Sequence, residues 1–92
     1  MTDYLVVYDV ADPRRLRRIA KKVEKYGVRV QKSVFECMLS DGHRRELEAE
    51  SMKIMDEAED SMRIYPLLAK SREKQCILGN GVMLDFSVAV VV

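Results

Sequence analysis

Asp9 is the carboxylate whose position in this sequence best suits metal chemistry. It follows Tyr4–Tyr8, a continuous run of β-branched and aromatic residues that predicts a strand covered on both faces. A carboxylate at the carboxyl end of such a strand can bind a hard cation through oxygen. The alternative is a turn-forming aspartate that bonds its own backbone, which is the commoner role of this residue type. Asp12 has a separate explanation, because Asp12-Pro13 is the signature of a helix N-terminus.

A strongly basic segment follows Asp9. Residues 13–32 hold nine Lys or Arg against one acid, a local balance of +8, whereas residues 36–60 hold nine acids against three bases, a balance of −6. Charge runs are usually solvated surfaces, but here the i,i+4 ion pairs of an ordinary solvated helix are mostly missing. We therefore expect the basic segment to bind phosphates. The candidates, whose guanidinium groups suit bidentate phosphate contact, are Arg14, Arg15, Arg18 and Arg29.

The other chemically capable residues are predicted to be structural. His43 is the only histidine, and no serine or cysteine pattern supports a catalytic pair with it. Cys37 and Cys76 have no CxxC spacing and are expected to be reduced. Tyr8 and Tyr65 could stack on bases, but both fall within strand runs that favour core packing. The six Met residues are expected to fill the core.

The positions of apolar residues predict the elements that hold these side chains. A helix is expected from Pro13 to Gly27, with an inward stripe formed by Leu16, Ile19, Ala20 and Val23 and the bases on its opposite face. Val28–Leu39 is extended in character but is interrupted by three polar residues, 31–33. It can form one bent strand or two short strands that meet at a bulge, and we favour two.

The second half of the chain predicts a helix and further strands. The helix is expected from about His43 to Glu59, capped by Ser40 or Asp41, with an acidic outer face. Its predicted inward residues are Leu47, Ser51, Ile54, Met55 and Ala58. A strand over residues 61–67 is expected to stop at Pro66, and a charged loop over 69–74 to follow it. A short strand over 75–78, a glycine turn and a final strand over 83–92 complete the prediction.

This order predicts an α+β fold, the ferredoxin-like βαββαβ unit with an additional C-terminal strand hairpin, in one domain over residues 1–92. The final strand is apolar on both faces, so we expect a second copy to cover it in a symmetric dimer. No apolar run is long enough to span a bilayer, and no export signal is recognisable. The protein is therefore expected to be cytoplasmic.

Four segments of the chain together resemble one known family. They are Tyr8-Asp9, Tyr26-Gly27, residues 29–37 and residues 60–67. The combination is similar to the small Cas endonuclease family of CRISPR spacer acquisition, and the match covers nearly the whole chain. The block from Arg29 to Glu36 is the most specific, because nothing in a generic ferredoxin-like domain requires that polar sequence there.

The resemblance implies a homodimeric, metal-dependent endonuclease that acts on DNA or RNA. Asp9 would be the catalytic and Mg²⁺-binding residue, one from each subunit across the interface, with Tyr8 and Phe35 in support. The family also bridges dimers of the CRISPR integrase subunit and holds the incoming DNA fragment. One carboxylate per subunit leaves most of the coordination sphere to water and phosphate oxygens, so the residues support weak hydrolysis and favour the scaffolding role.

Two other interpretations stay open at this point. A toxin-type ribonuclease can share both the fold and the strand-terminal aspartate. A non-enzymatic ferredoxin-like module is the second, although an RNA-recognition motif needs exposed aromatic residues on two central strands and residues 34–37 contain only Phe35. A third interpretation, a dimer that regulates by binding a small molecule, would not explain the net charge of +8 in residues 13–32. The sequence does not decide between DNA and RNA, or whether hydrolysis occurs.

The apolar final strand leads to a first prediction about assembly. Deletion of Val88–Val92 should convert the dimer into monomer or aggregate, because the strand that pairs with the second copy is removed. Sedimentation velocity measures this directly. A truncated chain that sediments as a clean dimer would place the interface elsewhere.

Overall fold

The computed structural model describes residues 1–68. This part of the chain has six elements in the order strand, helix, strand, strand, helix, strand. Their bounds are β1 Thr2–Asp9, α1 Pro13–Glu24, β2 Gly27–Gln31, β3 Val34–Leu39, α2 Asp41–Ile54 and β4 Ser61–Leu67. The predicted loop over 69–74, the short strand over 75–78 and the final strand over 83–92 lie outside the described residues.

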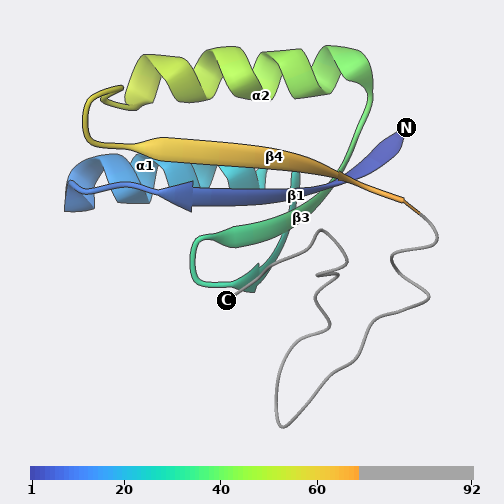
Figure 1. Cartoon of the computed structure of the whole chain (residues 1–92), viewed down its shortest axis with the longest axis horizontal. Helices are drawn as coiled ribbons and strands as arrows, with labels where there is room; N and C mark the ends of the chain where they lie inside the picture. The colour runs from blue at the N-terminus through green and yellow to red at the C-terminus, as the bar shows by residue number, and fades with distance from the viewer. Residues whose placement is uncertain (69–92) are drawn as a thin grey trace, which may run out of the picture.

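The four strands form one antiparallel sheet in the order β2-β3-β1-β4, and both helices lie on the same side of it (Figure 1). This topology confirms the predicted α+β fold of the ferredoxin-like type. β1 has a neighbour on each side, as its continuous apolar run predicted. Neither α1 nor α2 is long and apolar enough to cross a membrane.

Strand alternation divides β1 between the two sides of the sheet. Tyr4, Val6 and Tyr8 belong to the main core cluster, in which they pack with residues of both helices. The intervening residues, including Leu5, therefore lie on the face away from the helices. The cluster also contains Phe35, which is fully buried. The core thus sits between the sheet and the helix layer, and it determines which β1 residues remain on the far face.

Helix α1 forms as its sequence predicts. The Asp12 side chain accepts a hydrogen bond from the Arg15 backbone N–H at 2.9 Å, which satisfies a donor that the first turn leaves unpaired. The predicted inward stripe packs against the core, with Ile19 and Val23 buried. The helix ends at Glu24 rather than at Gly27, which is the first residue of β2.

The segment after α1 forms two strands, as favoured from the sequence. The chain turns at residues 32–33, where Ser33 adopts a left-handed conformation with φ of 64°. The strands therefore meet at a turn and not at the bulge expected there, and the register between β2 and β3 shifts within β2, between Arg29 and Gln31.

Helix α2 is shorter than predicted, and this prediction of its end was wrong. Its cap is Ser40, whose Oγ accepts the His43 N–H at 3.1 Å, but the helix ends at Ile54 instead of Glu59. Local bonds from side chains compete with the helix here: the carboxylate of Asp56 accepts the Ala58 N–H at 2.9 Å. Ala58, predicted to point inward, is therefore exposed.

Strand β4 continues through Pro66 to Leu67, one residue beyond the predicted stop. Pro66 lies opposite Tyr4 of β1. β4 is an edge strand of the described sheet. An edge strand tolerates proline, because a missing N–H on its open side takes no hydrogen bond from the sheet.

A close approach at Gly27 leads to a stability prediction. A methyl group at this position would overlap the carbonyl oxygen of Glu36 and the Sγ of Cys37, both on the neighbouring strand β3. Gly27→Ala should therefore lower the free energy of unfolding by about 1–3 kcal/mol in urea denaturation. Gly42→Ala is the matched control, because its Cβ would meet only the Ser40 Oγ at 3.9 Å. That change should raise stability by up to about 1 kcal/mol, and equal effects at the two glycines would contradict the prediction.

Candidate metal and nucleic-acid site

Asp9 is the last residue of β1, and its side chain is exposed. It pairs in the sheet with Ser61, the first residue of β4. Since Tyr8 faces the helices, alternation places Asp9 on the opposite face of the sheet. Within residues 1–68 the Asp9 carboxylate forms no hydrogen bond or ion pair, including the turn-type backbone bond that the alternative role requires. It is therefore available to a ligand from solution.

A second carboxylate, Asp60, lies just before β4 and has the opposite character. Its side chain has no exposed surface and accepts hydrogen bonds from three residues. Arg15 donates through Nε to Oδ2 at 2.8 Å and through Nη2 to Oδ1 at 3.3 Å. The backbone N–H of Ala11 donates to Oδ1 at 2.9 Å, and that of Asp56 to Oδ2 at 2.8 Å. Both oxygens are thus saturated by donors.

These bonds account for the electrostatics of the pair. The hydrogen bonds from Arg15, together with those from the Asp56 and Ala11 backbone, lower the pKa of Asp60 to about 2 against the opposing effect of burial. The same contact with Asp60, assisted by Glu59, raises the pKa of Arg15. Asp60 is therefore a carboxylate that stays ionised and stays paired.

Arg15 was predicted to bind phosphate, and the structure gives it another position. Two of its three guanidinium nitrogens bond to Asp60, and Nη2 also donates to Glu59 Oε2 at 3.0 Å. Its side chain is only 23% exposed. The guanidinium is thus engaged within the protein. Sequence reasoning missed this partner because Arg15 and Asp60 are 45 residues apart, and the only signal was an acid directly before the strand predicted over residues 61–67.

The other bases of α1 remain on its outer face. Arg14, Arg17, Arg18, Lys21 and Lys25 are exposed, and none of them forms an ion pair with another described residue. Lys22 alone turns toward α2, where its Nζ lies 3.5 Å from Glu50 Oε2. The outer face of α1 is therefore a continuous positive surface that can take phosphates.

Arg29 lies at the other end of this surface, on an aromatic support. Its guanidinium carbon sits 5.1 Å from the centre of the Phe35 ring, and Phe35 stacks on Tyr8 with ring centres 6.1 Å apart. Burial raises the pKa of Tyr8, and the charge of Arg29 opposes this rise. Since both rings are buried, they support Arg29 and do not stack on bases. An ion pair of 3.5 Å to the exposed Glu24 completes its contacts.

The predicted site residues therefore form two groups in one subunit. Arg29 pairs in register with Phe35, so it lies on the helix side of the sheet together with Tyr8. Asp9 lies on the other side. Arg14 and Arg18 lie on α1 and Arg29 on β2, all on the helix side of the sheet, and within residues 1–68 none of them bonds to Asp9.

Asp9 meets the chemical requirement for Mg²⁺ only in part. An exposed carboxylate offers the hard oxygen that this ion prefers. Within residues 1–68, however, no three His, Cys, Asp or Glu side chains gather into a group that could hold a metal ion. The remaining ligands would have to be water, phosphate oxygens or a second subunit.

Two further groups behave as the sequence predicted. His43 is exposed at the start of α2, with its ring edge near Tyr26. Cys37 is free and buried, and burial raises the pKa of its thiol to about 11, which suppresses the reactive thiolate. Neither residue has an arrangement that supports nucleophilic catalysis.

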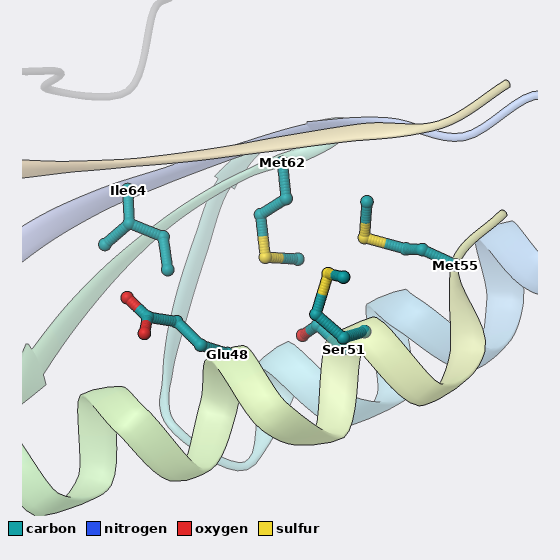
Figure 2. A pocket seen from close by; sticks show the side chains of 6 residues that line it. Glu48, Ser51, Met55, Met62 and Ile64 are labelled. Atoms are coloured by element: carbon teal, nitrogen blue, oxygen red, sulfur yellow. The ribbon is translucent and has the colours of Figure 1, made fainter. Parts of the chain in front are cut away.

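A cavity of about 270 Å³ lies between α2 and β4. Figure 2 shows Met55, Met62 and Ile64 pointing into it around Ser51. Ser51 is buried, and its Oγ has no hydrogen-bond partner. The one carboxylate in the lining, Glu48, is bonded to Arg44 at 2.8 Å. Half of the lining is flexible methionine, and it offers no paired groups for acid–base chemistry. The prediction that the methionines fill the core was wrong for Met1, Met38 and Met52, which are 81%, 59% and 52% exposed, since Met38 lies on the face of the sheet away from the helices and Met52 on the outside of α2.

The fold and these side chains place the chain among small proteins of the ferredoxin-like class that carry a positive helix surface and an exposed carboxylate at a strand end. Comparison with known families is more specific. The family model described as CRISPR associated protein Cas2 matches residues 1–75. The chain belongs to the Cas2 family, which confirms the resemblance inferred from the sequence.

Individual relatives agree with this assignment. A CRISPR-associated endoribonuclease Cas2 of Synechocystis is 48% identical over 64 residues, which is 70% of each chain. One from Moorella thermoacetica is 35% identical and covers 95% of this chain and 96% of its own. Cas2 of Streptococcus pyogenes superposes with a TM-score of 0.75 at 38% identity, over 84% of this chain and 99% of that one. A chain of a partial Cas6-RT-Cas1–Cas2 complex superposes with a TM-score of 0.79 at 27% identity over the full length of both.

The depressed pKa of Asp60 leads to a prediction about acid stability. An unfolded aspartate has a pKa of about 3.9, whereas that of folded Asp60 is about 2. The contribution of Asp60 to folding is therefore complete above about pH 5 and is lost as the pH falls through 4 toward 2. Urea denaturation should show wild type and Asp60→Asn far apart at pH 7 and closer together at pH 3. The control Glu57→Gln, an exposed carboxyl of the same loop, should differ little from wild type at either pH, and a constant gap for Asp60→Asn would contradict the prediction.

Proposed function

We propose that this protein is a spacer-acquisition subunit of a CRISPR system, a nuclease-like homodimer that binds nucleic acid and bridges integrase subunits in the cytoplasm. Family membership supports this role, since relatives are named endoribonucleases and endonucleases. The full-length similarity to a chain of a complex that contains Cas1 supports the integrase partner. The observation that carries the proposal is the outer face of α1, where arginine and lysine stand exposed without acidic partners among the described residues.

The arginines account for nucleic-acid binding. Arg14 and Arg18 extend into solvent from α1, and Arg29 is held over Phe35. Guanidinium groups in fixed positions bind phosphate oxygens regardless of base sequence. Arg15 serves instead to hold α1 against Asp60. We therefore assign phosphate binding to Arg14, Arg18 and Arg29.

Asp9 accounts for the proposed metal-dependent hydrolysis. Bound Mg²⁺ would supply Lewis-acid stabilisation of the charge that develops on the scissile phosphate. Asp9 would hold the cation at the end of β1, and the second copy would contribute its own Asp9. With one carboxylate from each chain, the affinity depends on the phosphate that is bound, so slow hydrolysis is expected.

The face of the sheet that carries Asp9 is the proposed dimer interface. Val28 and Met38 on this side are 70% and 59% exposed. A second copy placed here would bury them and bring the two Asp9 residues toward a common axis. The predicted pairing of the final strands lies outside the described residues and would add to this contact.

The alternative functions receive less support. An RNA-recognition motif needs aromatic residues exposed on its central strands, whereas Tyr4, Tyr8 and Phe35 are all buried toward the helices. The toxin-type ribonuclease shares the fold, but the relatives described above carry Cas2 names. A scaffold without hydrolytic activity remains the second candidate, favoured by the single carboxylate of each chain.

The arginine surface gives a prediction about salt dependence. Ala substitutions of Arg14, Arg18 and Arg29 should each weaken binding to duplex DNA of any sequence. Each should also reduce the slope of log K against log salt by about 0.9 for every phosphate that the variant no longer neutralises. Arg45→Ala, an exposed arginine of α2 outside the basic surface of α1, is the control and should keep the wild-type slope. Unchanged slopes in all three variants would contradict phosphate binding and would show that the outer face of α1 is an ordinary solvated surface.

Asp9 gives a prediction that separates hydrolysis from scaffolding. Asp9→Asn keeps the shape but removes the charge, so it should abolish Mg²⁺-dependent cleavage and leave DNA binding in EDTA nearly intact. It should also remove the stabilisation of the dimer by Mg²⁺. For a dissociation constant of about 1 mM, that effect is about 1.4 kcal/mol at about 10 mM Mg²⁺. Thermal unfolding and a nuclease assay measure the two effects, and wild-type cleavage by the variant would assign the activity to another residue or a contaminant.

A further inference from the structure

Asp9 and the turn that follows it are held by one short segment of the chain, Asp60-Ser61. In the sheet it lies opposite Ser61. Two residues later, the Ala11 N–H donates to the carboxylate of Asp60, the residue directly before Ser61. Asp9 and the chain just after it are thus attached to two consecutive residues, so the position of Asp9 depends on the positions of Asp60 and Ser61.

The same carboxylate also orients α1. Arg15 in the first turn donates to both oxygens of Asp60. Arg14 and Arg18, the proposed phosphate ligands, are carried by the same helix within one turn of Arg15. A rotation of α1 that moved these two arginines would therefore also break the bonds from Arg15 to Asp60.

Asp60 is itself held in a closed turn. Its backbone N–H donates to the Asp56 carbonyl at 2.8 Å, and the Asp56 N–H returns a bond of 2.8 Å to its carboxylate. The side chain is fully buried, so water does not replace any of these donors. Both of its oxygens are needed, because Oδ1 accepts the Ala11 N–H and Oδ2 accepts the Asp56 N–H. Arg15 donates to both oxygens.

We propose that Asp60 is the positioning residue of this protein: it fixes the Asp9 carboxylate relative to the first turn of α1, so that cation binding and phosphate binding occur at a set spacing. The proposal rests on the proposed function for the role of Asp9. It goes further in naming a residue, remote from Asp9 in sequence and in contact with no substrate, on which that role depends. Substitution of a residue that hydrogen-bonds a metal ligand commonly changes metal affinity by about 10–100-fold, and Asp60 acts on Asp9 one step further away, through the Ala11 backbone.

The test uses the full chain and compares Asp60→Asn with Glu59→Gln. An asparagine has a single acceptor oxygen, so it cannot serve Ala11, Arg15 and Asp56 together. Glu59→Gln removes the exposed partner of the same guanidinium and leaves Asp60 intact. Two NMR readouts are taken at 25 °C. One is amide exchange of Ala11 relative to that of the core residue Val6 in EDTA, and the other is Mg²⁺ titration followed at the Asp9 amide.

We expect Asp60→Asn to accelerate Ala11 exchange at least tenfold relative to Val6 and to weaken Mg²⁺ binding at least tenfold, while Glu59→Gln matches wild type in both. A purely structural role for Asp60 would lower the melting temperature but leave the relative exchange and the Mg²⁺ affinity unchanged, and this result would overturn the proposal. If wild type binds no Mg²⁺, the proposed function of Asp9 fails, and the exchange data alone still decide whether Asp60 positions this segment.

A second variant covers the case in which Asp60→Asn does not fold. Arg15→Lys keeps the charge but replaces the contact of two guanidinium nitrogens with Asp60 by the contact of a single ammonium group. It should accelerate Ala11 exchange and weaken Mg²⁺ binding in the same direction as Asp60→Asn. Wild-type values of both quantities in Arg15→Lys would overturn the proposal.

Discussion

The buried pair of Asp60 and Arg15 determines how the segments at the Asp9 end of the sheet meet. A carboxylate without exposed surface is costly unless donors replace its water. Here the donors come from α1, from the turn between β1 and α1, and from the loop between α2 and β4. The carboxylate therefore ties three segments together at one point, and it imposes a geometry that hydrophobic packing alone would leave loose.

The rest of the described fold is held by apolar packing that leaves charge on the outside. Ile19 of α1, Phe35 of β3 and Leu47 of α2 are fully buried between the sheet and the helices. The outer face of α1 is basic, whereas the exposed charges of α2 are mixed, with Asp41 and Glu46 beside Arg45 and Lys53, because most of the acids expected on its outer face lie in the loop after Ile54. The two helices are linked where Lys22 and Tyr26 bond to Glu50. Attraction between the helices therefore uses only a few of these charges. The remaining bases on α1 are left for a polyanion.

Local patterns in the sequence predicted the parts of the structure that local physics controls. Asp12-Pro13 fixed the start of α1, and the 3.6-residue spacing of its apolar residues fixed the face that packs inward. The end of α2 was predicted wrongly because Asp56 and Asp60 capture backbone N–H groups, and helix periodicity does not register such competition. The role of Arg15 depends on a partner 45 residues away, and only the folded sheet brings the two together.

The separation of Asp9 from the arginines limits how one subunit can act on nucleic acid. Asp9 lies on the face of the sheet away from the helices, whereas α1 and Arg29 lie on the helix side. When a second copy covers the Asp9 face, as proposed, both helix layers remain outside and can hold phosphates at the two ends of the dimer. The cation site then lies at the centre, with two carboxylates and no adjacent arginine to hold the scissile phosphate. In the proposed dimer, such an arrangement would hold a nucleic acid firmly and would cleave it slowly, because the groups that provide affinity are not the groups that stabilise the transition state.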